Sequence, residues 1–198
     1  MTWLKVCGLT NHADTDAAAE AGVDALGFVL VPTSPRAISL HLAAELIARV
    51  EQKTFLLTHD LDPDALVAAA LRTGATGVQP YGRFAAESAE AATGVGLMVL
   101  RPLALHDEWQ RVPPAQFPLF DSKNPNGVAN GARLDPDQLP DTEREYVVAG
   151  GLTPQNVGPL IARRHPFGVD VSSGVEVRPG QKDPELIAAF AKAVRESN

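Results

Sequence analysis

The chain has 198 residues and a formal net charge of −7 at pH 7, from 17 basic and 24 acidic side chains. This acidic balance, with no basic block, argues against nucleic acid or an anionic membrane surface as the main partner. A single cysteine excludes an internal disulfide, and we expect neither a signal segment nor a membrane span, because no stretch approaches ~18 apolar residues. We therefore expect a cytoplasmic protein and one domain over residues 1–198.

Short apolar runs alternate with helical patterns along the whole chain. Most of these runs are apolar at consecutive positions, as in strands that are buried on both faces of a parallel sheet. The expected strands are residues 4–9, 25–31, 54–58, 77–81, 97–100, 119–121, 146–149 and 168–171.

Capping residues and apolar spacing predict the helices between these strands. Thr10 is expected to cap a helix over 13–21. Asp62 is expected to begin a helix that ends before Gly74, and Thr153-Pro154 is expected to begin the helix after strand 146–149. Further helices are expected through 42–50, 85–92 and 183–195, the last with a buried stripe at Ile187, Phe190, Ala191 and Val194. Prolines in 102–117 and a weak pattern at 135–139 predict truncated helices in units five and six.

This alternation predicts a parallel sheet covered by helices. Eight strand–helix units in one domain favour a closed (β/α)8 TIM barrel over an open doubly wound sheet. A barrel of 198 residues lies at the small end of the usual range. In such barrels the chemistry lies at the carboxyl ends of the strands, so polar residues at those ends are the functional candidates.

Two strand ends near the end of the chain share one chemistry. Gly150-Gly151 follows the strand at 146–149, and Ser172-Ser173-Gly174 follows the strand at 168–171. Small residues let backbone N–H groups approach a ligand, and a helix N-terminus adds unpaired donors. Either turn alone is more simply an ordinary tight connection. Because the two follow consecutive strands, together they favour a phosphate held from both sides.

The polar candidates at the other strand ends each allow two interpretations. Cys7 is either a small buried apolar residue or a general base, and Asp121 is either a turn residue or a catalytic acid. Arg36 is either surface-exposed or a fork for a carboxylate. Further candidates are His59, Gln79, Tyr81, Arg101 and Asp170, the last with an expected structural role in holding the loop after its strand. No Cys/His cluster, HExxH motif or P-loop indicates a metal or a nucleoside triphosphate.

Several segments together carry a resemblance to a known family. They are Lys5-Val-Cys-Gly-Leu9, Asp24-Ala-Leu-Gly-Phe28, Ser34-Pro-Arg-Ala-Ile38, Leu119-Phe-Asp-Ser122, Ala149-Gly-Gly-Leu152 with Asn156-Val157, and 168–176 with Lys182-Asp183. In these segments the chain resembles phosphoribosylanthranilate isomerases, collinearly over its whole length. The resemblance implies a (β/α)8 barrel without a cofactor, monomeric or homodimeric. It also implies a phosphorylated small-molecule substrate, rearranged in the fourth step of tryptophan biosynthesis.

The resemblance also implies roles for the candidates. Asp121 is the expected general acid, which protonates the furanose ring oxygen, and Cys7 the expected base, which removes the C2′ proton. Arg36 is expected to orient the anthranilate carboxylate. The remaining substrate-binding residues are expected to be Gln79 and Tyr81, and, around the phosphate, Gly150, Gly151, Ser172, Ser173 and Gly174.

The chain departs from the family pattern at the predicted catalytic face. Tyr81 replaces a histidine, Pro80 stands inside a strand, and His59 replaces an asparagine. The loop after strand 119–121 contains Val128-Ala-Asn-Gly131 in place of a Gly-Gly-Thr-Gly element. Two alternatives therefore stay open: a related phosphosugar-amine isomerase with an altered substrate, and a non-catalytic barrel that binds a phosphate ligand.

Overall fold

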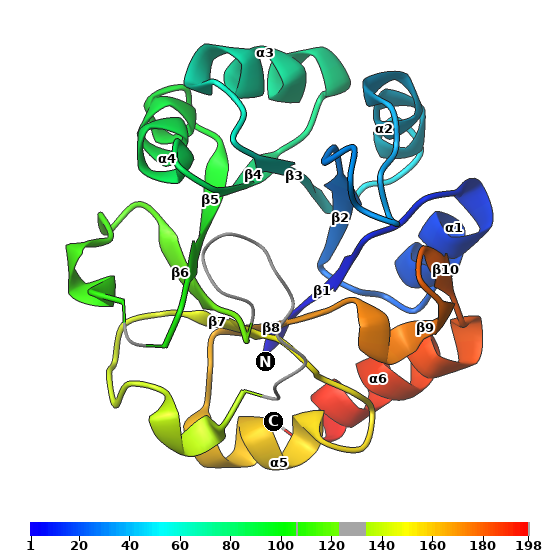
Figure 1. Ribbon diagram of the computed structural model, residues 1–198. Helices are drawn as coiled ribbons and strands as arrows, with labels where there is room; N and C mark the ends of the chain where they lie inside the picture. Colours follow the sequence, from blue (N-terminus) through cyan, green and yellow to red (C-terminus); the bar gives the residue numbers. More distant parts are fainter. Residues whose placement is uncertain (106, 123–133, 198) are drawn as a thin grey trace.

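A computed structural model of the protein describes residues 1–105, 107–122 and 134–197. Eight parallel strands form a closed barrel in sequence order, because β1 pairs with both β2 and β8 (Figure 1). The predicted (β/α)8 fold is confirmed. The strands are β1 (Trp3–Cys7), β2 (Ala25–Val29), β3 (Lys53–His59), β4 (Gly77–Tyr81), β5 (Met98–Leu103), β6 (Phe117–Phe120), β7 (Val147–Ala149) and β8 (Gly168–Val171).

Helices surround this barrel and are reduced to single turns on one side (Figure 1). In the described residues only the 3-10 turn η1 (Trp109–Arg111) follows β5, and only η2 (Pro136–Gln138) follows β6, as predicted. None of the described helices is long and apolar enough to cross a membrane. The helices are α1 (His12–Glu20), α2 (Leu40–Ile47), α3 (Pro63–Thr73), α4 (Ala85–Gly94), α5 (Val157–Arg164) and α6 (Pro184–Glu196).

Two predicted helix starts are wrong. Asn11, not Thr10, caps α1 by accepting the Asp14 amide, while the Thr10 hydroxyl bonds to Gly180. Helix α5 begins at Val157 rather than at Thr153-Pro154. The Asn156 side chain accepts from the Thr153 amide at 2.8 Å and donates to the Gly151 carbonyl at 2.9 Å. Residues 151–156 are thereby folded into a turn before the helix can start.

A short element after β8 was not predicted. The 3-10 turn η3 (Ser173–Val175) leads into an antiparallel pair, β9 (Glu176–Arg178) and β10 (Gln181–Lys182), and then into α6. Asp183 caps α6, and the predicted stripe of this helix is buried. The hairpin matters for the site because it carries Glu176 and Lys182 back to the mouth of the barrel.

The barrel interior changes from apolar to polar along its axis. At the amino-terminal end of the strands, Trp3 packs on Phe55 and Phe167, with ring centroids 5.9 and 6.1 Å apart. Lys5 is next along β1 and is fully buried. Cys7 is last, in a cluster with Val29, Leu57 and Tyr81. The alternation of β1 thus delivers polar groups to the carboxyl end of the barrel, where loops can cover a ligand.

Candidate active site

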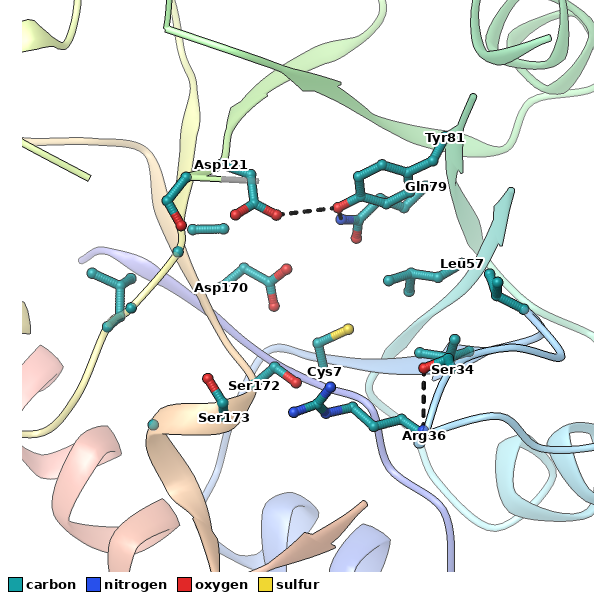
Figure 2. Close-up of a pocket in the computed structure, with 18 of the residues that line it drawn as sticks. Cys7, Ser34, Arg36, Leu57, Gln79, Tyr81, Asp121, Asp170, Ser172 and Ser173 are labelled. Atoms are coloured by element: carbon teal, nitrogen blue, oxygen red, sulfur yellow. Dashed lines mark hydrogen bonds between the residues drawn. The ribbon is translucent and has the colours of Figure 1, made fainter. Parts of the chain in front are cut away.

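A pocket of about 400 Å³ lies at the carboxyl ends of the strands, a size that suits one small ligand (Figure 2). All the predicted site residues line it: Cys7, Arg36, Gln79, Tyr81, Asp121, Gly150, Gly151, Ser172, Ser173 and Gly174. His59 and Asp170 line it as well. In the view of Figure 2, Asp121 and Tyr81 lie on one side, and Cys7 with Arg36 on the other. The structure therefore brings residues from β1, β4, β6 and the last two βα loops to one cavity.

One part of the pocket, the anion side, consists of Arg36 and the turns 150–151 and 172–174. Both glycines of the first turn have positive φ, +95° at Gly150 and +66° at Gly151. A Cβ on Gly174 would collide with the carbonyl oxygen of Leu152, so the two turns pack directly on each other. The first amides of η3 also lack an intrahelical acceptor. Together these features make a backbone cradle of the kind that binds phosphate.

Arg36 is held by a carboxylate that the sequence did not assign. Its Nε and Nη2 donate to the two oxygens of Glu176 at 2.8 and 2.7 Å. Lys182 also donates to Glu176, at 2.8 Å, and to the Ser172 carbonyl at 3.1 Å. The pKa of Glu176 is lowered, because these hydrogen bonds and charges outweigh the opposing effect of burial. Two cations and one anion leave this cluster with one net positive charge beside the cradle.

The centre of the barrel contains a second charge cluster around Lys5. Its ammonium is 2.8 Å from Asp170 Oδ2 and 3.1 Å from Gln79 Oε1. Burial lowers the pKa of Lys5, but Asp170 and Cys7 outweigh it and the net shift is upward. A Cβ on Gly27 would lie only 2.8 Å from Cys7 Sγ and 3.1 Å from Lys5 Nζ. The absence of a side chain at Gly27 therefore gives the thiol and the ammonium their space.

Asp170 has a different hydrogen-bond partner from the one expected. It was predicted to hold the loop after its strand, but it reaches across to Lys5 on β1. Its other oxygen, Oδ1, is buried and has no hydrogen-bond partner among the described residues, although Asp170 lines the pocket. Asp170 is thus the counter-ion of a buried lysine at the pocket floor.

The opposite part of the pocket, the acid side, consists of Gln79, Tyr81 and Asp121. Gln79 Nε2 donates to the Tyr81 oxygen at 2.7 Å, and the Tyr81 hydroxyl donates to Asp121 Oδ2 at 3.3 Å. The pKa of Tyr81 is raised well above 10.0, first by burial and then by the negative charges of Asp121, Asp170 and Cys7. Tyr81 therefore stays a neutral phenol, able to donate.

Of the other candidates, one belongs to the site and one does not. His59 lies at the rim, with Nδ1 3.3 Å from Asp60 Oδ2. Arg101 does not line the pocket, because it alternates with the inward-facing Leu100 and shares the outward face of β5, towards the helices. Val128–Gly131 lie outside the described residues. Among those described, no group of three His, Cys, Asp or Glu side chains is placed to hold a metal ion.

Lys5, Glu176 and Lys182 were missed as site residues. The signal for Lys5 was present, because a residue two positions before Cys7 in a strand shares its face. Glu176 and Lys182 lie on either side of a hairpin that sequence periodicity did not reveal. Glu176 lies 140 residues from Arg36 in the chain, and Lys182 lies further still. No local sequence pattern could therefore predict that they form a cluster with Arg36.

The fold and the site together define a class of protein. A (β/α)8 barrel whose mouth joins a backbone anion cradle to a thiol and a carboxyl group is built for acid–base chemistry on a small phosphorylated molecule. The sequence profile of N-(5'-phosphoribosyl)anthranilate isomerase matches residues 4–193. The chain belongs to this family, and it is an isomerase.

Individual relatives agree over their whole lengths. The chain is 37% identical to the N-(5'-phosphoribosyl)anthranilate isomerase of Rhodopseudomonas palustris, covering 98% of this chain and 96% of the relative. It resembles the phosphoribosyl anthranilate isomerase structure from Thermus thermophilus with a TM-score of 0.87, 29% identity and full coverage of both chains. A further structure, with a TM-score of 0.81 and 28% identity over 99% of this chain and 100% of that one, is a phosphoribosyl anthranilate isomerase in complex with reduced 1-(o-carboxyphenylamino)-1-deoxyribulose 5-phosphate.

Proposed function

We propose that this chain converts N-(5′-phosphoribosyl)anthranilate to 1-(2-carboxyphenylamino)-1-deoxyribulose 5-phosphate, with Asp121 as general acid and Cys7 as general base. The observation that carries the assignment of roles is that these two groups line one pocket together with the anion side. This Amadori rearrangement needs one proton donor and one proton acceptor. The Schiff-base nitrogen of the opened substrate serves as the electron sink.

Asp121 acts first. Its proton goes to the furanose ring oxygen, the C1′–O bond breaks, and the nitrogen lone pair forms the C1′=N⁺ bond of the Schiff base. Asp121 is left as a carboxylate, to which the Tyr81 hydroxyl donates. Asp121 lies at the carboxyl end of β6, next to the end of β7, whose following loop contributes Gly150 and Gly151.

Cys7 then removes the C2′ proton as a thiolate. The electron pair of the C2′–H bond moves to the C1′–C2′ bond, which gives the enolamine that tautomerises to the ketone. Positive charges near a thiol favour its thiolate form. Lys5, Arg36 and Lys182 all interact electrostatically with Cys7, and each of these interactions favours the charged forms of both partners.

The anion side holds the two anionic ends of the substrate. The turns 150–151 and 172–174 offer backbone amides to the 5′-phosphate, as the Gly and Ser residues there permit. Arg36 presents one edge of its guanidinium to Glu176 and has further N–H groups for the anthranilate carboxylate. Gln79 and Tyr81 are assigned to the opposite wall. We also propose a cytoplasmic protein, monomeric or homodimeric; a relative from Thermotoga maritima is described as dimeric.

The test is a fluorescence assay with the substrate generated in place, using wild type and Cys7→Ala. We expect wild type to consume the anthranilate fluorescence and Cys7→Ala to lower kcat by on the order of 10² or more, the usual contribution of a positioned base. Because Cys7 is the only cysteine, its alkylation rate against pH reports the thiolate directly. An unchanged kcat in Cys7→Ala would remove Cys7 from the mechanism.

Tyr81 supports a second candidate, a related isomerase for another phosphoribosylamine, because a phenol stands where the family pattern has histidine. Side-by-side turnover of several phosphoribosylamines separates the two functions. Faster turnover of an amine other than anthranilate would establish the second one. Folded wild type without turnover of any of these amines would favour a barrel that only binds a phosphate ligand.

A further inference from the structure

Four side chains form a continuous row of hydrogen bonds across the pocket floor, from the buried Lys5 to Asp121. Lys5 donates to Gln79 Oε1, Gln79 Nε2 donates to Tyr81, and Tyr81 donates to Asp121 Oδ2. Gln79 is 1% exposed and Lys5 is 0% exposed, so water does not compete for these groups. The row reaches the residue to which we assign the acid.

The direction of every bond in the row is fixed by Lys5. An ammonium can only donate, so the Gln79 oxygen must face Lys5 and the amide NH₂ must face Tyr81. The Tyr81 oxygen therefore accepts from Gln79, and its own hydrogen turns to its other partner, Asp121. Because burial keeps the pKa of Tyr81 well above 10.0, this hydrogen stays in place throughout the working pH range.

We propose that Tyr81 is a positioning residue for Asp121: its hydroxyl, oriented by Lys5 through Gln79, reserves Oδ2 as an acceptor and leaves the acid proton to Oδ1. This rests on the proposed role of Asp121 as acid. When Asp121 gives up its proton, the Tyr81 hydrogen bond becomes charge-assisted and stronger. The row thus stabilises the carboxylate that forms as the ring opens.

The row can orient Asp121, but it cannot conduct a proton. Gln79 stands in its middle, and passing a proton through an amide would require its unstable imidic form. The charges of Asp121, Asp170 and Cys7 act on Tyr81, Arg36 and His59 line the same pocket, and Lys5 is linked to Tyr81 through Gln79.

The test is Tyr81→Phe, which removes one oxygen and keeps the ring. A donor to a carboxylate favours its ionised form, so its removal raises the pKa of Asp121. In a ¹³C-carboxyl aspartate NMR titration, assigned with Asp121→Asn, we expect this pKa to rise by about one unit. We expect the plateau value of kcat, reached where Asp121 is protonated, to fall about tenfold with little change in KM, and the limb of the kcat profile due to Asp121 to move to higher pH. Tyr81→His, whose imidazole can donate, should recover most of the lost rate.

Tyr146→Phe is the matched control, because Tyr146 is the only other tyrosine and its hydroxyl bonds to the Arg164 carbonyl, away from the pocket. It should leave the Asp121 titration unchanged. Gln79→Glu tests the orientation: a carboxylate there would accept from both neighbours and turn the Tyr81 hydrogen away from Asp121. In Gln79→Glu/Tyr81→Phe the two pKa shifts should be clearly less than additive, because one effect passes through the other.

Three results would overturn the proposal: an Asp121 titration unchanged in Tyr81→Phe, a loss confined to KM, or strictly additive shifts in the double variant. The titration does not depend on turnover. Wild type that fails to isomerise the substrate would therefore refute the proposed function and still leave the role of Tyr81 decided by NMR.

Discussion

The two sides of the pocket differ in whether backbone or side-chain groups form them. The anion side is largely backbone, set by glycines whose missing side chains let turns 150–151 and 172–174 pack against Ser122 and Leu152. The acid side is a row of side chains, in which each group depends on the orientation of the one before it. Binding by the backbone site depends on free space around its turns. Orientation of Asp121 by the side-chain row depends on the direction of each hydrogen-bond donor.

The two sides of the pocket constrain substitution in different ways. On the anion side an added Cβ would collide with Ser122 at Gly150 and with the Leu152 carbonyl at Gly174, so these two positions require glycine. On the acid side, the Tyr81 phenol stands where the resemblance leads us to expect an imidazole, and both groups can donate to a carboxylate. Single substitutions on each side can test whether the two sides act independently.

The largest effect is expected on the acid side, from Asp121→Asn. The amide keeps the shape of the carboxyl group but has no acidic proton, so kcat should fall by 10²- to 10⁴-fold, the range for a lost general acid. The affinity for inorganic phosphate, measured by competitive inhibition or calorimetry, should stay close to that of wild type. Equal losses of kcat and phosphate affinity would show that the two sides are not separate.

Next in size is Glu176→Gln, which leaves Arg36 and the fully buried Lys182 without their anion. Removing one partner of a buried ion pair should lower the free energy of unfolding by about 3 kcal/mol, measured in urea at pH 7. Glu108→Gln, in an exposed pair with Arg111, is the control and should cost under about 0.5 kcal/mol.

The pH dependence of this loss has a definite sign. Because the folded-state pKa of Glu176 lies below the ordinary value of 4.5, its charge stabilises the fold above pH 4.5. That stability is lost as the pH falls through the folded-state pKa. The difference between wild type and Glu176→Gln should therefore shrink below pH 4.5. A constant difference down to strongly acidic pH would mean that the carboxylate charge is not what holds Arg36 and Lys182.

The smallest effect is expected from Gly174→Ala. The added Cβ would collide with the Leu152 carbonyl and push the two turns apart. We expect affinity for inorganic phosphate to fall about tenfold, or roughly 1.4 kcal/mol, with a smaller change in kcat. Gly94→Ala is the control, since an added Cβ there meets no atom within 4 Å and, as at Gly174, the backbone φ is not positive. Phosphate binding equal to that of wild type would remove the cradle from the anion side.

Local patterns were sufficient for much of the fold. The bounds of β4 and β8 match the prediction, because each is a short run between clear turn signals. Asp62 and Asp183 begin α3 and α6 through side-chain bonds to the next amides, a contact within three residues. The start of α5 was missed because Thr153-Pro154 and Asn156 both carry capping signals, and only packing decides between them.

The missing parts of the site depend on long-range contacts. Whether Asp170 faced the barrel or the helices could not be read from β8 alone, since its neighbours Val169 and Val171 are as apolar as the interior. Its partner, Lys5, lies 165 residues away. The orientation of Arg101 was misjudged for the same reason: a strand end shows that a side chain is near the rim, but not on which face.

The Lys5–Asp170 pair also bears on how the chain is made. At about 5–20 residues per second, a ribosome that has produced Lys5 needs roughly 10–30 s to reach Asp170. During that time a nascent partial barrel can enclose Lys5 only at the cost of burying an unpaired charge. The pairing with Asp170 therefore disfavours any closed arrangement of the strands that leaves out β8. Barrel closure and neutralisation of the buried Lys5 charge thus depend on the same strand, β8.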